Sequence, residues 1–374
     1  MTRGHSSKVG AASVIGCATG KVVWIGTRSK VCKSCEYWDN ADKNSDKYRH
    51  WQANHAPNCT HNHDGSSGAM EKEIVKEIFC SSAQDHKLRY TRFIGDGDTN
   101  SCKTVHDAQP YGPDATVQKI ECVGDVEKRM GTGLRKLKRD FGSRKLADNK
   151  PIGGRGRLTK DKIDVIQTHY GNAIRGNKNN LVKMREVVWV VFFHYNSTGA
   201  EPTHSFCGQE WCPYKKAVTQ GTVGDYKHTS SLPKAVMDQI RPIFKDLSKT
   251  ELLSKCLEGY TQNANESLNG LIRKLCPKVG NHGLVTMDIS VELAVSMFSC
   301  GASAFGQVLA QMGLCVGRFS LDCFESKDFA RIQNSQRQAK QATHKERRAR
   351  RRKRLQQDEE QEEVEGFSYM TGGH

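Results

Sequence analysis

The order of apolar and polar positions predicts strands at the start of the chain and helices through most of the rest. Residues 6–16 and 21–31 are rich in Val and Ile and flank a turn-forming run, a pattern typical of a β-hairpin. Apolar residues at helical spacing predict a helix over 70–81, and residues 88–94 alternate as a third strand. This order of strand, strand, helix and strand indicates an α/β domain.

Beyond residue 99 the pattern is mostly helical. One more short strand is predicted over 117–123, and the predicted helices cover 126–141, 159–174, 181–193, 234–257 with a break at Pro242, a short stretch after Asn265, and 284–312. Two polar stretches, 32–62 and 202–233, have no apolar period and are expected to be irregular. Residues 142–156 are rich in Gly and Lys, which predicts a flexible joint between two helices.

Composition narrows the class of protein. The fourteen cysteines follow no apolar leader, so we expect reduced thiols or metal ligands rather than disulfides. No run approaches the roughly 18 consecutive apolar residues of a membrane-spanning helix, and we therefore expect no membrane partner. Lys and Arg outnumber Asp and Glu by 57 to 41, and the net charge of +16 favours an acidic partner such as nucleic acid.

The excess positive charge is concentrated in one internal segment. Residues 345–365 carry eight positive and seven negative charges, so this stretch nearly cancels itself. Residues 128–162 hold thirteen Lys and Arg against three Asp, a net charge of +10, and contacts to nucleic-acid phosphates draw on such density. The alternative is a solvated helix face. The candidate DNA-binding residues are Lys128, Arg129, Arg135, Lys136, Lys138, Arg139, Arg155 and Arg157.

A first group of Cys and His residues has the spacing of metal ligands. It starts with a Cys-x2-Cys pair, and its second half follows 20 to 30 residues later, just before His61 and His63. Three thiolates and one imidazole would complete a tetrahedral structural zinc site in a segment too polar to fold otherwise, with unliganded thiols as the alternative. The candidate ligands are Cys32, Cys35, His55 and Cys59.

A second group lies in the long polar stretch 202–233. Its two cysteines are separated by four residues, within the range of zinc sites, but the histidines are more distant in sequence. Structural zinc and an ordinary surface loop therefore both remain open. The candidate ligands are His204, Cys207, Cys212 and His228.

Two carboxylates are candidates for a different metal chemistry. Asp96 follows the strand predicted over 88–94 within the run Gly-Asp-Gly-Asp, and Glu266 begins a predicted helix. Hard cations such as Mg²⁺ take oxygen ligands, and phosphoryl transfer uses a pair of metals held by such carboxylates. The alternatives are a tight turn at Asp96 and an acid that favours the start of a helix at Glu266.

Six segments form a colinear series of motifs along the chain. They are the Cys-x2-Cys pair, residues 62–71, Arg3-Gly-His-Ser-Ser, Leu88-Arg-Tyr-Thr-Arg-Phe-Ile-Gly-Asp-Gly-Asp98, Glu121-Cys-Val-Gly-Asp-Val-Glu-Lys-Arg-Met-Gly131 and Thr261-Gln-Asn-Ala-Asn-Glu-Ser267. Together these segments resemble the Mutator-like transposase domain of animal genomes, and the resemblance runs from about residue 3 to residue 317.

The resemblance implies an α/β fold with a ribonuclease-H-like core that is interrupted by a mostly helical insertion. Such transposases hold two divalent metals, Mg²⁺ or Mn²⁺, with an Asp-Asp-Glu triad and cut and join DNA strands during DNA transposition. The second aspartate matches Asp96, with Asp98 as a reserve, and the glutamate matches Glu266. The implied partners are double-stranded DNA at transposon ends and further copies of the chain, and the implied location is the nucleus.

Two departures from the family pattern bear on activity. The first aspartate of the triad belongs to a strand just before the segment matched by residues 3–7, so we expect a core that lacks its first strand and an impaired metal site. Asp125 stands where relatives commonly have the His of a Cys-x2-His motif that starts at Cys122. The alternatives are a domesticated, non-catalytic protein that binds DNA or chromatin, and a truncated gene model of an active transposase.

The expected organisation has four parts. Residues 1–98 would form the first part of the core, with the Cys/His-rich insert at 32–63. Residues 99–260 would form the basic helical insertion, with the second group of Cys and His residues at 204–228. Residues 261–325 would return to the core with the glutamate, and residues 326–374 would form a disordered charged tail.

Overall fold

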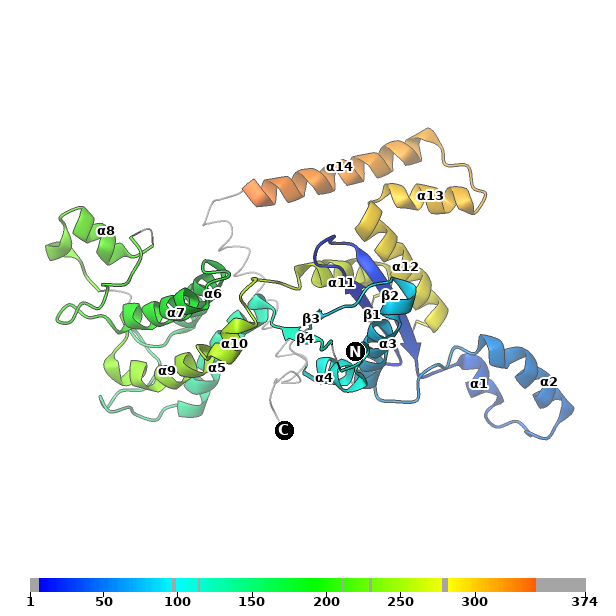
Figure 1. Ribbon diagram of the computed structural model, residues 1–374, viewed down its shortest axis with the longest axis horizontal. Helices are drawn as coiled ribbons and strands as arrows, with labels where there is room; N and C mark the ends of the chain where they lie inside the picture. Colours follow the sequence, from blue (N-terminus) through cyan, green and yellow to red (C-terminus); the bar gives the residue numbers. More distant parts are fainter. Residues whose placement is uncertain are drawn as a thin grey trace. The chain divides into compact units, whose positions relative to one another are not determined.

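The computed structural model describes residues 7–95, 99–113, 115–209, 211–228, 231–277 and 282–340. These residues form a mixed fold of helices and short strands in which helices predominate (Figure 1). They divide into two compact units. The first unit comprises Met1–Tyr90, Lys103–Thr116 and Asn263–His374, and the second comprises Thr91–Cys102 and Val117–Gln262. No helix among the described residues is long and apolar enough to cross a membrane.

The first unit is built around an antiparallel hairpin of β1 and β2, as the sequence predicts. Helix α3 covers the hairpin with Met70 and Ile74, and a Cβ at Gly10 would lie only 2.9 Å from Met70 Sδ, so glycine permits the close approach. Helix α12 also packs on the hairpin, where Thr27 donates a hydrogen bond to Asp288. The elements are β1 (Val9–Ile15), β2 (Val22–Ser29), α1 (Lys33–Trp38), α2 (Asp46–His55), α3 (Ser67–Asp85), α4 (Thr99–Ala108, which begins in the second unit), α11 (Asn263–Leu275), α12 (Leu284–Cys300), α13 (Ser303–Gln311) and α14 (Arg318–Lys340).

The disordered tail was predicted to begin at residue 326, which is wrong. Residues 326–340 instead continue helix α14. Asp328 of α14 accepts hydrogen bonds from the backbone amides of Ala302 (2.7 Å) and Ser303 (3.1 Å) at the start of α13. Burial opposes ionisation of Asp328, but these amide donors lower its pKa. The carboxylate therefore satisfies amides that the first turn of α13 leaves without helical partners. The rest of the predicted tail, residues 341–374, lies outside the described residues.

The second unit pairs two short parallel strands, β3 and β4, with a helical core. Buried apolar side chains of α5, α6, α7 and α9 fill that core, and Met130, Ile166 and Val188 are almost fully buried. Gly131 lets α5 and α6 approach closely, since a Cβ there would overlap the Gln167 side chain. The elements are β3 (Arg92–Ile94), β4 (Gln118–Ile120), α5 (Val123–Phe141), α6 (Lys160–Arg175), α7 (Leu181–Asn196), α8 (Pro213–Thr219), α9 (Lys234–Leu247) and α10 (Thr250–Ser254), with short 3₁₀ turns at Ala56–Asn58 in the first unit and Val223–Asp225 in the second.

The structure shifts several predicted boundaries. The strand predicted over 88–94 is restricted to Arg92–Ile94, because Lys87 has a positive φ of 56° and the amide of Tyr90 donates to the Tyr111 hydroxyl instead of to a strand. The sequence predicted one helix over 234–257 with a break at Pro242. In the structure, helix α9 continues through Pro242 and ends at Leu247. Helices α1 and α2 lie in a stretch that was expected to be irregular.

Candidate metal centres and basic surface

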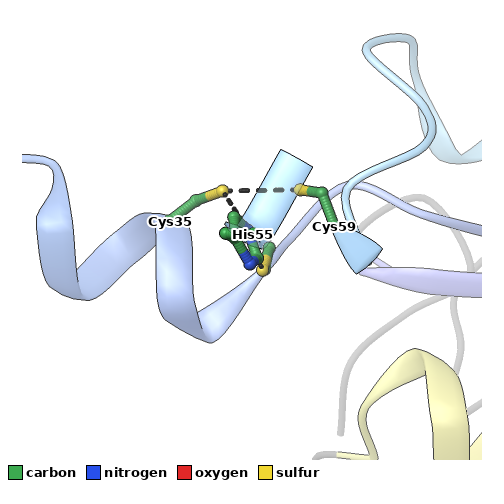
Figure 2. Close-up of side chains that lie close together, drawn as sticks. Cys35, His55 and Cys59 are labelled. Atoms are coloured by element: carbon green, nitrogen blue, oxygen red, sulfur yellow. Dashed lines mark hydrogen bonds between the residues drawn. The ribbon is translucent and has the colours of Figure 1, made fainter. Parts of the chain in front are cut away.

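The first Cys/His cluster, Cys32, Cys35, His55 and Cys59, has the composition that the sequence predicts for a metal site. The ligand atoms of these residues all lie within 4.8 Å of one another. Cys32 precedes α1, Cys35 lies in its first turn, and His55 ends α2, so the two helices carry most of the ligands. Figure 2 shows the side chains of Cys35, His55 and Cys59 turned toward one point. The cluster could hold a metal ion such as zinc.

His55 belongs to a row of stacked aromatic rings. Trp51 stacks on His55 with 4.8 Å between ring centroids, and Trp38 stacks on Trp51 at 5.2 Å. The indole nitrogen of Trp51 donates to Ser34 Oγ at 2.9 Å, which links α2 back to α1. Neither helix contains a buried residue. The ligand cluster and this ring stack are therefore the main contacts that can hold the segment in one conformation.

The environment of the thiols is uneven. Burial raises the pKa of Cys32, but hydrogen bonds from the side chain of Thr60 and from backbone amides outweigh it and bring the pKa down to about 6. Burial, together with the neighbouring Cys59 and Cys32, raises the pKa of Cys35 to about 12. Adjacent thiolates repel one another in this way unless a cation lies between them, and zinc supplies such a cation in Cys-rich sites.

The residues of the second Cys/His cluster, His194, His204, Cys207 and Cys212, are all buried, and their ligand atoms also lie within 4.8 Å of one another. His194 belongs to the last turn of α7, whereas Cys212 directly precedes α8, which begins with Pro213. Burial lowers the pKa of both His194 and His204 to about 4, so both rings are neutral and can offer a lone pair to a metal. Burial also raises the pKa of Cys207 to about 12.

Distances within the second cluster fit a tetrahedral ion. Bond lengths of about 2.3 Å to sulfur and 2.0–2.1 Å to nitrogen place S and N ligands about 3.6 Å apart around zinc. Cys207 Sγ lies 3.7 Å from His194 Nδ1 and 3.6 Å from His204 Nδ1, and Cys212 Sγ lies 3.8 Å and 3.6 Å from the same two atoms. The first cluster is slightly tighter, with Cys32 Sγ and Cys35 Sγ 3.4 Å and 3.2 Å from His55 Nε2.

His228 was predicted to belong to the second cluster, but it lies outside it. The fourth member of the cluster is His194. The His228 ring stacks on that of His204 at 5.3 Å and contacts Tyr214 instead. His194 was not among the predicted ligands because it ends an apolar helical run, a pattern that indicates core packing. The available signal was its spacing, ten residues before His204. In the first group, His63 is also set apart, since its buried ring bonds to Glu73 (2.7 Å) and to the Ser66 carbonyl (3.0 Å).

The predicted DNA-binding residues fall into two classes. Arg129, Arg135 and Arg157 are engaged with acids of the same unit: Arg129 donates to Glu121 at 2.6 Å, Arg135 lies 3.6 Å from Asp164, and buried Arg157 bonds to Asp148. Lys128 also lies 3.2 Å from Asp125. In contrast, Lys136, Arg139 and Arg155 are exposed and Lys138 is half-buried. Within the described ranges, no acid forms an ion pair with Lys136, Lys138 or Arg155.

The predicted catalytic carboxylates have no described geometry as a pair. Asp96 and its reserve Asp98 lie outside the described residues, between β3 and α4. Glu266 is exposed in the first turn of α11. Cys122 is buried directly before α5, and burial together with neighbouring Asp125 raises its pKa. One oxygen of Asp125 is buried without a hydrogen-bond partner in the described part of the chain.

Comparison with known proteins identifies the family. A family model described as Mutator-like transposase matches residues 1–212, more than half of the chain. Searches of curated proteins and of solved structures found no match. The matched residues include all of the first Cys/His cluster, all of the second, and the basic segment between them. The chain belongs to the Mutator-like transposase family.

Proposed function

We propose that this member of the Mutator-like transposase family binds double-stranded DNA through a basic face of its second unit. We use the name basic face for five exposed or half-buried cations of the C-terminal half of α5 and the loop after it, Lys136, Lys138, Lys145, Lys150 and Arg155. The observation that carries the proposal is the absence of ion pairs at these side chains within the described ranges, whereas nearby Arg129, Arg135 and Arg157 are each paired with an acid. Unpaired cations are available to phosphates, and the counterions that they displace drive nucleic-acid binding.

A titration of the full chain with duplex DNA at increasing salt tests this function. If most of the basic face contacts phosphates, the logarithm of the binding constant should fall with the logarithm of the salt concentration with a slope of about −3 to −4.5. Binding should be measurable near 0.1 M salt and should depend little on DNA sequence. The absence of binding at that concentration, or binding without a salt slope, would overturn the proposal.

The proposal also assigns a structural zinc ion to each of the two Cys/His clusters. Each cluster supplies four protein ligands, and sites of that kind stabilise a fold without offering an open position to a substrate. Zinc bound there would therefore hold α1 with α2, and α7 with the segment before α8. We expect metal analysis of the purified, reduced chain to find two equivalents of zinc, and a finding of none would contradict both sites.

Phosphodiester cleavage is a second candidate function, favoured by the exposure of Glu266 in the first turn of α11 and by its match to the family pattern. In that case Glu266 would serve as one of the carboxylates that hold Mg²⁺ or Mn²⁺ beside the scissile phosphate, as the family pattern implies. Incubation with terminal-repeat duplexes and Mg²⁺ tests it. Cleavage that Glu266→Gln abolishes, with DNA binding retained, would support catalysis. Binding without cleavage would favour the non-catalytic alternative.

A further inference from the structure

The loop between α5 and α6, residues 142–158, has a defined conformation of two successive tight turns. In the first turn the amide of Asn149 donates to the Leu146 carbonyl, and the amide of Leu146 donates to the Lys150 carbonyl, both at 2.9 Å. The second turn is closed by the amide of Arg157, which donates to the Gly154 carbonyl at 3.1 Å. This arrangement corrects the flexible joint that the Gly and Lys content predicts. We call residues 142–158 the double turn.

Two kinds of contact hold the double turn in place. Leu146, Ile152 and Leu158 are buried in the helical core, so the loop is anchored at three points along its length. Arg157 of the second turn is only 6 % exposed and donates two hydrogen bonds to Asp148 of the first turn, one of them 3.2 Å long. Hydrogen bonding from Arg157 lowers the pKa of Asp148. The pair thus ties one turn to the other across the loop.

The anchors leave the remaining cations of the loop facing solvent. Lys150 and Arg155 are exposed, and Lys138 reaches the loop from α5, because a Cβ at Gly153 would lie 3.1 Å from Lys138 Cε and 3.8 Å from its Nζ. Gly154 has a φ of 114°, a conformation that L side chains rarely adopt, and no described atom lies within 4 Å of the position that its Cβ would occupy. The backbone at this point is therefore open to a bulky ligand.

We propose that the double turn is a preordered site for the phosphate backbone of duplex DNA, in which Lys138, Lys150 and Arg155 contact phosphates. The pair formed by buried Arg157 and exposed Asp148 positions these cations and does not itself touch DNA. This inference rests on the proposed DNA binding and adds a specific claim: the shape of the loop, and not only its charge, sets the affinity. Cations held in place lose less side-chain freedom when they bind than cations on a mobile segment.

Two variants with the same change in charge separate shape from charge. Asp148→Asn and Asp140→Asn each make the basic segment one unit more positive, but only Asp148 bonds to Arg157. A patch that acts by charge alone would bind DNA more tightly in both variants. We expect Asp140→Asn to bind as tightly as the unchanged chain or slightly more tightly, and Asp148→Asn to bind about threefold to tenfold more weakly. Tighter binding by both variants would overturn the proposal.

A second set of variants tests the contacting residues even if Asp148→Asn fails to fold. The triple variant Lys138→Gln, Lys150→Gln and Arg155→Gln should reduce the salt slope by about 2 to 3. The matched control removes the same charge from exposed lysines of α7 and α9, with Lys183→Gln, Lys234→Gln and Lys245→Gln, and should change the slope by less than about 1. Equal effects of both triples would overturn the inference while leaving the proposed DNA binding intact. No salt-dependent binding by the unchanged chain would instead contradict the proposed function itself.

Discussion

The two Cys/His clusters have similar ligands but stand in contrasting surroundings. The first joins α1 and α2, which bury no residue of their own. The second draws His194 from α7, a helix whose apolar side chains belong to the main core of the second unit. A metal at the first cluster would replace a hydrophobic core, whereas a metal at the second would fasten a polar loop to an existing core. The contrast predicts different outcomes when each cluster is disturbed.

The largest effect is expected at the first cluster. Cys35→Ser should cost one equivalent of zinc and unfold residues 32–59, because structural zinc contributes about 10–16 kcal/mol to the folding of zinc-finger peptides at neutral pH. Metal analysis and hydrogen exchange over α1 and α2 would measure this loss. Cys80→Ser, at an exposed cysteine of α3, is the control and should retain both equivalents. If the amides of α2 remain as protected from hydrogen exchange in Cys35→Ser as in the unchanged chain, then this helix does not depend on the metal.

A smaller effect is expected at the second cluster. His194→Ala should lose one equivalent of zinc and lower the free energy of unfolding of the second unit by roughly 2–4 kcal/mol, since a buried side chain is removed together with a ligand. Its helices should still form, because their apolar core is retained. His228→Ala should keep both equivalents. If His228→Ala loses zinc and His194→Ala does not, the ligand assignment is wrong.

The smallest effect compares one helix cap in each region. Ser45 Oγ accepts a hydrogen bond from the Tyr48 amide at the start of α2, and Asn180 Oδ1 accepts one from the Lys183 amide at the start of α7. Replacement of either residue by Ala should cost about 1 kcal/mol. We expect Ser45→Ala to speed hydrogen exchange only within 32–59 and Asn180→Ala to lower the melting temperature of the second unit. A lower melting temperature of the second unit in Ser45→Ala would contradict the independence of the two regions.

Sequence patterns predicted the elements that apolar packing stabilises. Helix α6 begins at Lys160 with Thr159 as its cap, since Thr159 Oγ1 accepts from the Lys162 amide at 3.2 Å. The hairpin and helix α3 also follow from apolar spacing. In contrast, α1 and α2 have no apolar face and are organised by ligands and stacked rings, which leave no hydrophobic period in the sequence. The sequence nevertheless grouped the four residues of the first cluster, because Cys-x2-Cys spacing is visible without knowledge of the fold.

The sequence could not assign roles to residue types that serve two purposes, such as a histidine that can pack in a core or bind a metal. A histidine at the end of an apolar helix indicates core packing, so His194 could be recognised as a candidate ligand only through its position in space. The net charge of residues 128–162 likewise does not distinguish one cation from another. In the structure, Arg157 is buried and bonds to Asp148, whereas Arg155 is exposed. Two arginines separated by a single glycine therefore differ in availability because the second turn directs one inward and the other toward solvent.

Asp328 has a practical consequence for anyone who shortens this protein. A truncation at residue 325, where the charged tail was expected to begin, would remove the carboxylate that accepts from Ala302 and Ser303. The first turn of α13 would then lose its acceptor, and the remaining stub of α14 would lose its polar attachment. A fragment intended for crystallisation or for DNA titration should therefore extend through residue 340, with any removal of sequence confined to the residues beyond it.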